Sequence, residues 1–256
     1  MPATRRLRQL MGIPGFLLKL PSVSNLMYVA RLRYIQSIHE SSERRNPDLL
    51  VRHFIPLLER WRSAWISQDE LSKLRMNPFY YYLVARTKYY DQVFSDAVAE
   101  GVKSTVSVGC GSDTRPYRIM QILKSNGVRV LECDQPEAIR VKQRISKRWQ
   151  GLDHVDYLPI DLNDGAWPDL TRWVDERPDR KTLVLIEGVS PHVDGVSFEQ
   201  FLLLLASKLT AGSLVAYDFK TRGVEDDFGR KGRTESPFRL PSARSEVAAF
   251  HETHGL

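Results

Sequence analysis

The stretch TVSVGCGSDTRPYR, residues 105–118, decides the fold of this chain. It begins with a short β-branched run, passes through Gly109 and Gly111, and enters a segment that Pro116 opens as a helix. A buried strand that breaks into a glycine turn at a helix N-terminus brings backbone N–H groups against a nucleotide in α/β folds. The third glycine of the dinucleotide fingerprint would fall at Thr114. The stretch therefore predicts a nucleotide site with an incomplete NAD pattern.

From Gly101 onward, short apolar runs alternate with segments of helical periodicity. The alternation predicts an α/β fold with a doubly wound, mostly parallel sheet. The expected strands are residues 105–108, 128–133, 155–159, 183–186 and 213–219. The expected helices between and after them are residues 116–126, 136–149, 170–177, 198–209 and 242–253, and residues 224–236 are expected to form an exposed loop.

Residues 1–100 show no such alternation and are expected to be helical. Apolar residues recur at helical spacing over 49–65, and Asn77 with Pro78 predicts the start of a long helix that ends at Glu100. Residues 1–39 carry six Lys and Arg and no Asp or Glu. This basic start is typical of an organelle-targeting segment, of a membrane-surface helix, or of a helical cap with a solvated basic face.

Composition narrows the class of protein. No run of about 18 apolar residues occurs in the sequence, so a membrane-spanning helix is not expected. Cys110 and Cys133 fall at the ends of expected strands, which indicates reduced thiols and predicts a cytoplasmic location. The histidines lack metal-ligand spacing, and no basic groove interleaved with aromatic residues is visible. Neither a metal nor a nucleic-acid partner is therefore expected.

Carboxylates follow three of the expected strands. Asp134 closes the second strand, 23 residues after Gly111, where it would hold ribose hydroxyls or cap the next helix. Glu132 is the competing candidate. Asp161 follows the third strand and would accept a hydrogen bond from an adenine amino group or serve as a turn residue. Glu187 ends the fourth strand, where it needs a donor or a cation, or caps a helix.

Two basic side chains complete the set of candidates. Arg86 shares a face of the 77–100 helix with apolar residues. A guanidinium there needs an anion, which is either a ligand carboxylate or an internal partner such as Asp91 or Asp113. His192 follows the fourth strand and is either a general base or an ordinary loop histidine.

Five motifs resemble those of the S-adenosylmethionine-dependent leucine carboxyl methyltransferase family. They are, in chain order, ARTKYYD, GCGSDTRPYR, ECDQP, PIDL and IEGVSPH, and the match covers roughly residues 77–220. The family includes the carboxyl methyltransferase of protein phosphatase 2A, the tRNA wybutosine enzymes and polyketide O-methyltransferases of the tetracenomycin type. The resemblance implies a class I methyltransferase (Rossmann-like) fold, with a helical lid in residues 1–100. A domain that binds S-adenosylmethionine would occupy residues 101–256 without the last two strands of the family's sheet.

The resemblance also assigns roles to individual residues. It implies cofactor-binding roles for Arg86 at the methionine carboxylate, Gly109 and Gly111 beside the methionine moiety, Asp113 in the glycine turn, Asp134 at the ribose, Asp161 and Leu162 at the adenine, and Glu187 at the amino group. His192 stands where the family often has an aromatic residue, usually Tyr, and is the candidate catalytic base.

The reaction implied is methyl transfer to a carboxylate or hydroxyl oxygen of a small, polyketide-like molecule or of a peptide terminus. The alternatives are carboxyl methylation of a protein C-terminus, a non-catalytic cofactor-binding protein, a protein that contacts a membrane surface through residues 1–39, and a nicotinamide dehydrogenase. Aromatic residues before the glycine turn have two interpretations. They indicate a hydrophobic acceptor, or they are ordinary residues of the hydrophobic core. These residues are Trp61, Trp65, Phe79, Tyr80, Tyr81 and Tyr82.

Overall fold

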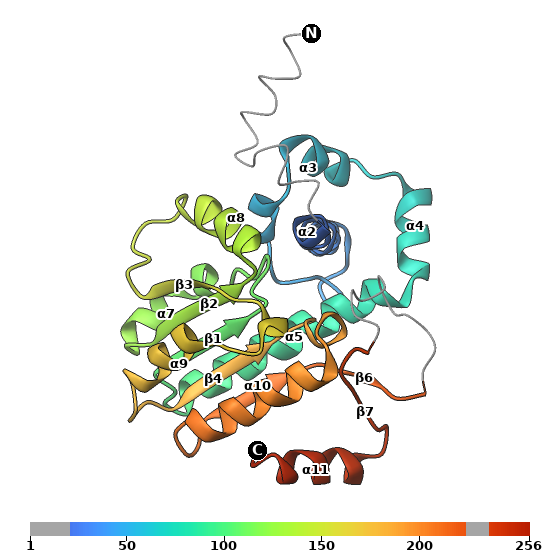
Figure 1. The fold of residues 1–256 in the computed structure, drawn as a ribbon. Helices are drawn as coiled ribbons and strands as arrows, with labels where there is room; N and C mark the ends of the chain where they lie inside the picture. Colours follow the sequence, from blue (N-terminus) through green and yellow to red (C-terminus); the bar gives the residue numbers. More distant parts are fainter. Residues whose placement is uncertain (1–20, 224–235) are drawn as a thin grey trace. The chain divides into compact units, whose positions relative to one another are not determined.

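The computed structural model describes residues 21–223 and 236–256, which form two compact units (Figure 1). The first unit takes in the described residues up to Val93, with Gly111–Ile122 and Gln135–Asp153. The second takes in Phe94–Cys110, Leu123–Asp134 and the described residues from His154 onward. The expected division into a lid of residues 1–100 and a cofactor domain stays a prediction.

A parallel sheet forms the centre of the second unit, with the strand order β3-β2-β1-β4-β5. Its strands are β1 (Ser104–Val108), β2 (Arg129–Asp134), β3 (Val155–Pro159), β4 (Thr182–Ile186) and β5 (Leu214–Tyr217). The chain adds strands outward from β1 to β3 and then returns to place β4 on the other side of β1. This reversal is the topological switch point of doubly wound sheets. The predicted fold class is confirmed.

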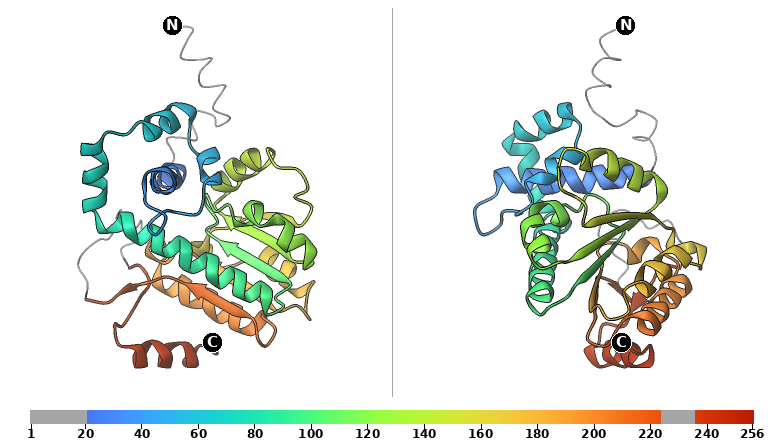
Figure 2. Two further views of the ribbon diagram at one scale, coloured as in Figure 1. Left: turned by 180° about the vertical axis from the view of Figure 1, so that it is seen from behind. Right: turned by 90° about the vertical axis from the view of Figure 1, so that its left-hand side faces the viewer.

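Helices cover both faces of this sheet (Figure 2). Valines at alternate positions of β1, Val106 and Val108, turn to the face covered by α9 (Pro168–Asp175) and α10 (Gly195–Lys208), because side chains alternate along a strand. There they share a core with Phe198 and other buried residues of α10. The last turns of α5 (Pro78–Ala99) and of α7 (Met120–Ser125) lie on the opposite side.

The end of the chain adds a smaller sheet and a helix to this unit. Strands β6 (Lys220–Thr221) and β7 (Arg239–Leu240) pair in parallel, and α11 (Arg244–Thr253) follows them. The hydroxyl of Tyr217 in β5 lies 2.7 Å from Nε2 of His251 in α11. The expected helix over 242–253 is confirmed as α11.

The first unit is helical. Its elements are α2 (Pro21–His39), η2 (Leu50–Phe54), α3 (Leu57–Ala64), α4 (Gln68–Met76), the first part of α5, α6 (Arg115–Arg118) and α8 (Pro136–Ser146). Helix α2, seen nearly end-on in Figure 1, packs on two sides. Ala30 and Tyr34 lie in a core with Val141 of α8, whereas Leu32 and Ile35 join a second core with α4 and α5.

Two predicted helices of this region differ from the structure. The periodicity over 49–65 predicts one helix, but the structure has η2 and α3, with Ile55 and Pro56 between them in extended backbone. Proline cannot donate a helical hydrogen bond, and it forces the preceding residue out of the helical region. The helix expected over 116–126 is divided into α6 and α7 at Ile119. The long helix after Asn77 is confirmed as α5, and Asn77 Oδ1 accepts a hydrogen bond from the N–H of Phe79 (3.0 Å).

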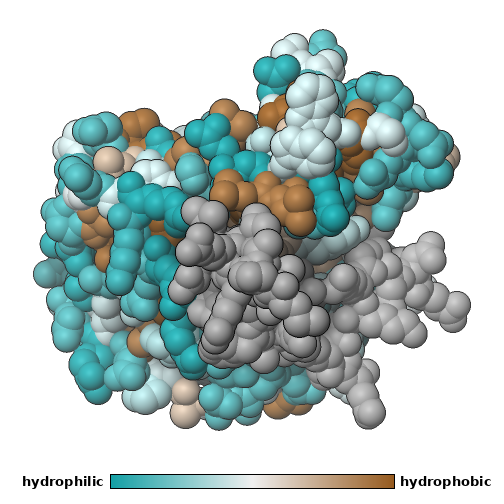
Figure 3. Space-filling model, turned by 90° about the horizontal axis from the view of Figure 1, so that it is seen from above, coloured by the Kyte–Doolittle hydropathy of each residue, from teal (hydrophilic) through white to brown (hydrophobic). Residues whose placement is uncertain are grey.

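Some of the aromatic residues considered for a core or an acceptor site are exposed. Trp61 and Trp65 are 63% and 77% exposed, whereas Tyr80 is buried. Figure 3 looks down on the side where α3 lies in Figure 1 and shows hydrophobic groups among hydrophilic ones. No helix in the described ranges is long and apolar enough to span a bilayer. Most of the expected 224–236 loop and the first half of the basic 1–39 segment lie outside the described residues.

Candidate functional site

Acidic side chains follow four of the five strands of the sheet, at the point where each strand ends. Asp134 is the last residue of β2, Asp161 comes two residues after β3, and Glu187 and Asp218 directly follow β4 and β5. The carboxyl ends of parallel strands share one edge, which is where ligands bind in folds of this type. The predicted placement of Asp134, Asp161 and Glu187 at this edge is confirmed.

Gly109 lies directly after β1, at a position of this edge where only glycine fits. Its φ is +68°, and a Cβ at this position would lie 2.2 Å from Cγ2 of Val189, in the loop after β4. Any other residue would clash there and would be strained at a positive φ. The β1 turn and the β4 loop are therefore in contact through this glycine.

We expect Gly109→Ala to lower the free energy of unfolding by about 2–4 kcal/mol, from the strain of a positive φ and from overpacking. Gly101→Ala is the matched control, because Gly101 has a φ of +91° and a methyl group there would meet no other atom within 4 Å. Gly101→Ala should lower the free energy of unfolding by about 1 kcal/mol, and denaturant unfolding of both variants measures the difference. Equal costs for the two variants would show that the close approach to Val189 is absent.

Asp218 is a residue of this edge that the sequence analysis missed. Its Oδ1 accepts a hydrogen bond from the N–H of Gly188 (2.7 Å), and its carbonyl accepts one from Oγ of Ser190 (2.8 Å). These bonds hold the segment that directly follows Glu187. The signal in the sequence was an aspartate after an apolar run, but the expected strand 213–219 enclosed it, whereas β5 ends at Tyr217.

Asp161 and Leu162 start a short 3-10 helix, η3 (Leu162–Asp164). Asp161 Oδ1 accepts hydrogen bonds from the N–H and the side-chain amide of Asn163, at 3.0 and 3.2 Å, and Leu162 is buried. The turn interpretation of Asp161 is thus confirmed. Its adenine contact stays a prediction.

The two acidic residues of β2 differ in burial. Glu132 is fully buried in the middle of the sheet, beside Ser107 of β1 and Tyr157 of β3, whereas Asp134 is partly exposed at the end of the strand. A ligand reaches an exposed strand end more easily than a buried strand centre. The position therefore favours Asp134 for ribose binding.

His192 ends a second short 3-10 helix, η4 (Ser190–His192), after β4. Its backbone N–H donates to the carbonyl of Val189 (2.8 Å), and its side chain is half-buried. The loop that carries Glu187 therefore carries His192 as well. Its role as a base stays a prediction.

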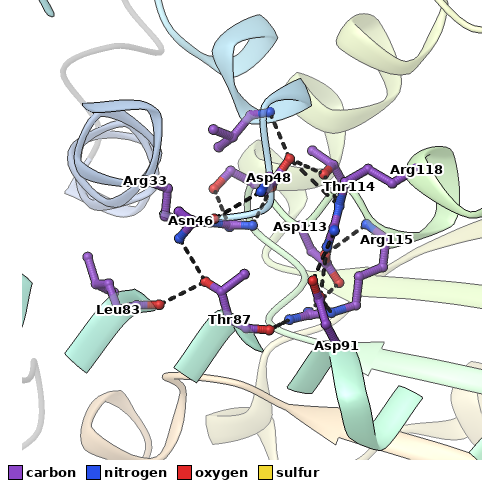
Figure 4. A network of polar contacts seen from close by, with 12 residues as sticks. Arg33, Asn46, Asp48, Leu83, Thr87, Asp91, Asp113, Thr114, Arg115 and Arg118 are labelled. Atoms are coloured by element: carbon purple, nitrogen blue, oxygen red, sulfur yellow. Dashed lines mark hydrogen bonds and ion pairs between the residues drawn. The ribbon is translucent and has the colours of Figure 1, made fainter. Parts of the chain in front are cut away.

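In the first unit, the segment that follows the glycine turn is buried and held by charged partners (Figure 4). Asp113 accepts hydrogen bonds from the backbone N–H and the guanidinium of Arg115, at 2.9 and 3.1 Å. Its carbonyl accepts one from Nζ of the fully buried Lys142 (2.7 Å). Burial favours the neutral acid, but Arg115 and Lys142 outweigh it and hold the pKa of Asp113 well below its usual range. Asp113 thus lies in the turn as an ionised, structurally bonded group.

Asp48 is the central acceptor of this network (Figure 4). It is fully buried, pairs with Arg33 of α2, and accepts hydrogen bonds from Oγ1 of Thr114 (2.5 Å) and from the N–H of Val51 (3.0 Å). Thr114 also accepts a hydrogen bond from Nε of Arg118 (3.1 Å). A glycine at position 114, as the dinucleotide fingerprint has it, would remove both bonds of this hydroxyl.

Arg86 lies in the same unit, on α5. It is partly buried, and its Cζ lies 5.4 Å from the ring centroid of Tyr82. Asp91, one of the internal partners considered for Arg86, accepts hydrogen bonds from Arg115 (2.7 Å) and Arg118 (2.8 and 2.9 Å). The expected contact of Arg86 with a ligand carboxylate stays a prediction.

Comparison with known proteins connects these residues to one family. The sequence profile of the leucine carboxyl methyltransferases matches residues 26–203. A protein of Mycobacterium ulcerans, assigned by name to the S-adenosyl-L-methionine-dependent methyltransferases, is 32% identical over 188 residues, which are 67% of this chain and 60% of that protein. A protein of Streptomyces coelicolor with the same assignment is 26% identical over 203 residues, 78% of this chain and 70% of its own length. The chain thus spans about 60% of the length of the mycobacterial relative.

Solved structures similar to this chain include PigF with SAH, with a TM-score of 0.45 and 12% identity over 100% of this chain and 94% of PigF. The mitomycin 7-O-methyltransferase MmcR gives a TM-score of 0.40 and 16% identity over 77% of this chain and 64% of its own.

Proposed function

We propose that this chain, which belongs to the leucine carboxyl methyltransferase family, binds S-adenosylmethionine and directs its methyl group to an oxygen atom of an acceptor. The observation that carries the proposal is the set of carboxylates at the carboxyl edge of the sheet, next to the glycine turn. The acceptor class is a carboxylate or hydroxyl of a small, polyketide-like molecule or of a peptide terminus. The name of the family favours a carboxylate.

The residues at this edge fit the chemistry of the methyl donor. Its ribose hydroxyls, its adenine amino group and the ammonium of its amino-acid tail are hydrogen-bond donors, and Asp134, Asp161 and Glu187 offer acceptor oxygens. Arg86 would pair with the carboxylate of the same tail, since a guanidinium binds a carboxylate through two parallel hydrogen bonds. When bound, the donor supplies an electrophilic methyl group on a positively charged sulfur.

The protein's own contribution would be to position the acceptor oxygen in line with that methyl group and to exclude water. Such positioning contributes about 7–11 kcal/mol to lowering a barrier. A carboxylate acceptor is already a nucleophile and needs a cation to hold it. A hydroxyl acceptor would lose a proton, and His192 is the side chain proposed to accept it.

We expect S-adenosylhomocysteine, but not NADH, to raise the melting temperature of the full chain. At a ligand concentration of 100 Kd the folded state gains about 2.7 kcal/mol, which corresponds to roughly 5–10 °C for a protein of this size. Stabilisation by NADH alone would contradict the proposal and support the dehydrogenase alternative.

The same preparation distinguishes the acceptor classes. After incubation with methyl-labelled S-adenosylmethionine and candidate acids and phenols, mild alkali releases labelled methanol from a methyl ester but not from a methyl ether. Label that stays on the product after alkali would exclude carboxyl methylation.

A further inference from the structure

Helix α3 turns its polar side toward the protein. The hydroxyl of Ser63, which is fully buried, accepts a hydrogen bond from Nε of Arg31 in α2 (3.2 Å), and its carbonyl lies 2.9 Å from Nε2 of His39. Glu59, one turn earlier, pairs with Arg31 at 3.9 Å. Polar contacts with α2 therefore fix this short helix.

The other side of α3 exposes large apolar side chains. Leu58 and Trp61 of α3 and Trp65, which directly follows the helix and donates its N–H to the carbonyl of Trp61, are spaced three and four residues apart, which places them on one side. Their exposed fractions are 50%, 63% and 77%, and Leu57 beside them is 47% exposed. We call these four residues the α3 face. Helices at a protein surface normally bury such a face, and clustered exposed apolar residues mark interaction sites.

Positive charge lies next to the α3 face. The pKa of His53, in η2, is lowered by burial and by the nearby guanidiniums of Arg52, Arg60 and Arg148. The pKa of Arg60, in α3 itself, is lowered mainly by burial; Tyr34 raises it, and Arg52 and Arg148 lower it by smaller amounts. Arg52 and Arg148 thus lie close enough to act on Arg60, and the three guanidiniums together form a cationic region, which attracts anions.

The charges decide between possible occupants of the α3 face. A second copy of the chain would bring Arg52, Arg60 and Arg148 against the same three arginines. Residues 1–20 carry Arg5, Arg6, Arg8 and Lys19 and no acidic residue, so they share the sign of this region. An anionic bilayer complements both the apolar residues and the arginines, because tryptophan favours the membrane interface and arginine pairs with phosphate.

We propose that the α3 face docks on the surface of an anionic lipid bilayer. The polar side of the helix stays bound to Arg31 and His39 of α2, so docking requires no unfolding of α3. Four large side chains and a few arginines give reversible attachment rather than permanent anchoring. The attachment is independent of the methyl acceptor and of the cofactor.

The test is co-sedimentation of the full chain with vesicles of phosphatidylcholine alone or with 30% phosphatidylglycerol. We expect at least tenfold tighter binding to the anionic vesicles, with most of the difference lost in 0.5 M NaCl. The variant with both Trp61→Ala and Trp65→Ala should bind the anionic vesicles at least tenfold more weakly, with unchanged circular dichroism. Tyr89→Ala is the matched control, because Tyr89 of α5 is also 63% exposed and lies outside the α3 face.

Three outcomes would overturn the proposal. One is equal binding to neutral and anionic vesicles, which would remove the role of charge. Another is equal loss of binding in the double variant and in Tyr89→Ala. The last is the absence of binding to anionic vesicles. A dimer in sedimentation velocity that the double variant loses would then make the α3 face an interface between copies.

Discussion

Asp48→Ala is expected to lower the free energy of unfolding by about 3–5 kcal/mol, because removing one partner of a buried ion pair leaves an uncompensated charge. The charge left behind is Arg33, which is only 4% exposed and whose carboxylate partner is Asp48. The variant also removes the acceptor of the Thr114 hydroxyl and of the Val51 N–H. Urea unfolding monitored by circular dichroism measures the loss.

Two further variants show whether the buried charge causes the loss. Asp175→Ala removes an acid from the exposed pair with Lys208 and should cost at most about 1 kcal/mol. Adding Arg33→Met to Asp48→Ala should recover part of the stability, since the stranded cation is then gone. A cost for Asp48→Ala no greater than that for Asp175→Ala would contradict the central role of Asp48.

Arg86→Ala is expected to weaken the binding of S-adenosylhomocysteine about 100-fold, or ~3 kcal/mol, through loss of a charge-assisted pair with the amino-acid carboxylate. 5′-Methylthioadenosine has the nucleoside and the sulfur but no amino-acid tail, so its affinity should not change. Isothermal titration calorimetry of both ligands makes this comparison. The affinity of Arg86→Lys for S-adenosylhomocysteine should fall between those of the unchanged chain and of Arg86→Ala, because an ammonium keeps the charge but not the paired hydrogen bonds.

Lys88→Ala is the control on the same helix and should leave both affinities unchanged. If Arg86→Ala weakened both ligands equally, Arg86 would act on the shape of the site rather than on the carboxylate. Intact binding of S-adenosylhomocysteine by Arg86→Ala would remove Arg86 from the proposed site altogether.

The sheet was predictable from local patterns. Strand β3 matches the expected strand at both ends, and β1, β2 and β4 differ from theirs by one residue. Short apolar runs between turn residues carry this information because a buried strand is apolar on both faces. The break between η2 and α3 was missed, although Pro56 marked it, because the apolar periodicity continues across the proline.

The partners of the charged residues were not predictable in this way. Asp48 and Thr114 are 66 positions apart, and nothing in a local pattern says which distant carboxylate accepts from which donor. Periodicity likewise shows that α3 has an apolar side, but not that this side faces solvent. Both properties depend on tertiary packing, which local sequence patterns do not reveal.

The distance along the chain between partners also bears on how the protein folds as it is synthesised. Arg33 and Asp48 leave the ribosome well before Thr114 and Arg118, and Arg33 contacts Ser112 across 79 positions. The bonds that these early residues make to the later segment form only after that segment has been synthesised, and closing so long a loop costs conformational entropy. The network around Asp48 therefore gains its full set of partners only after Arg118 has left the ribosome.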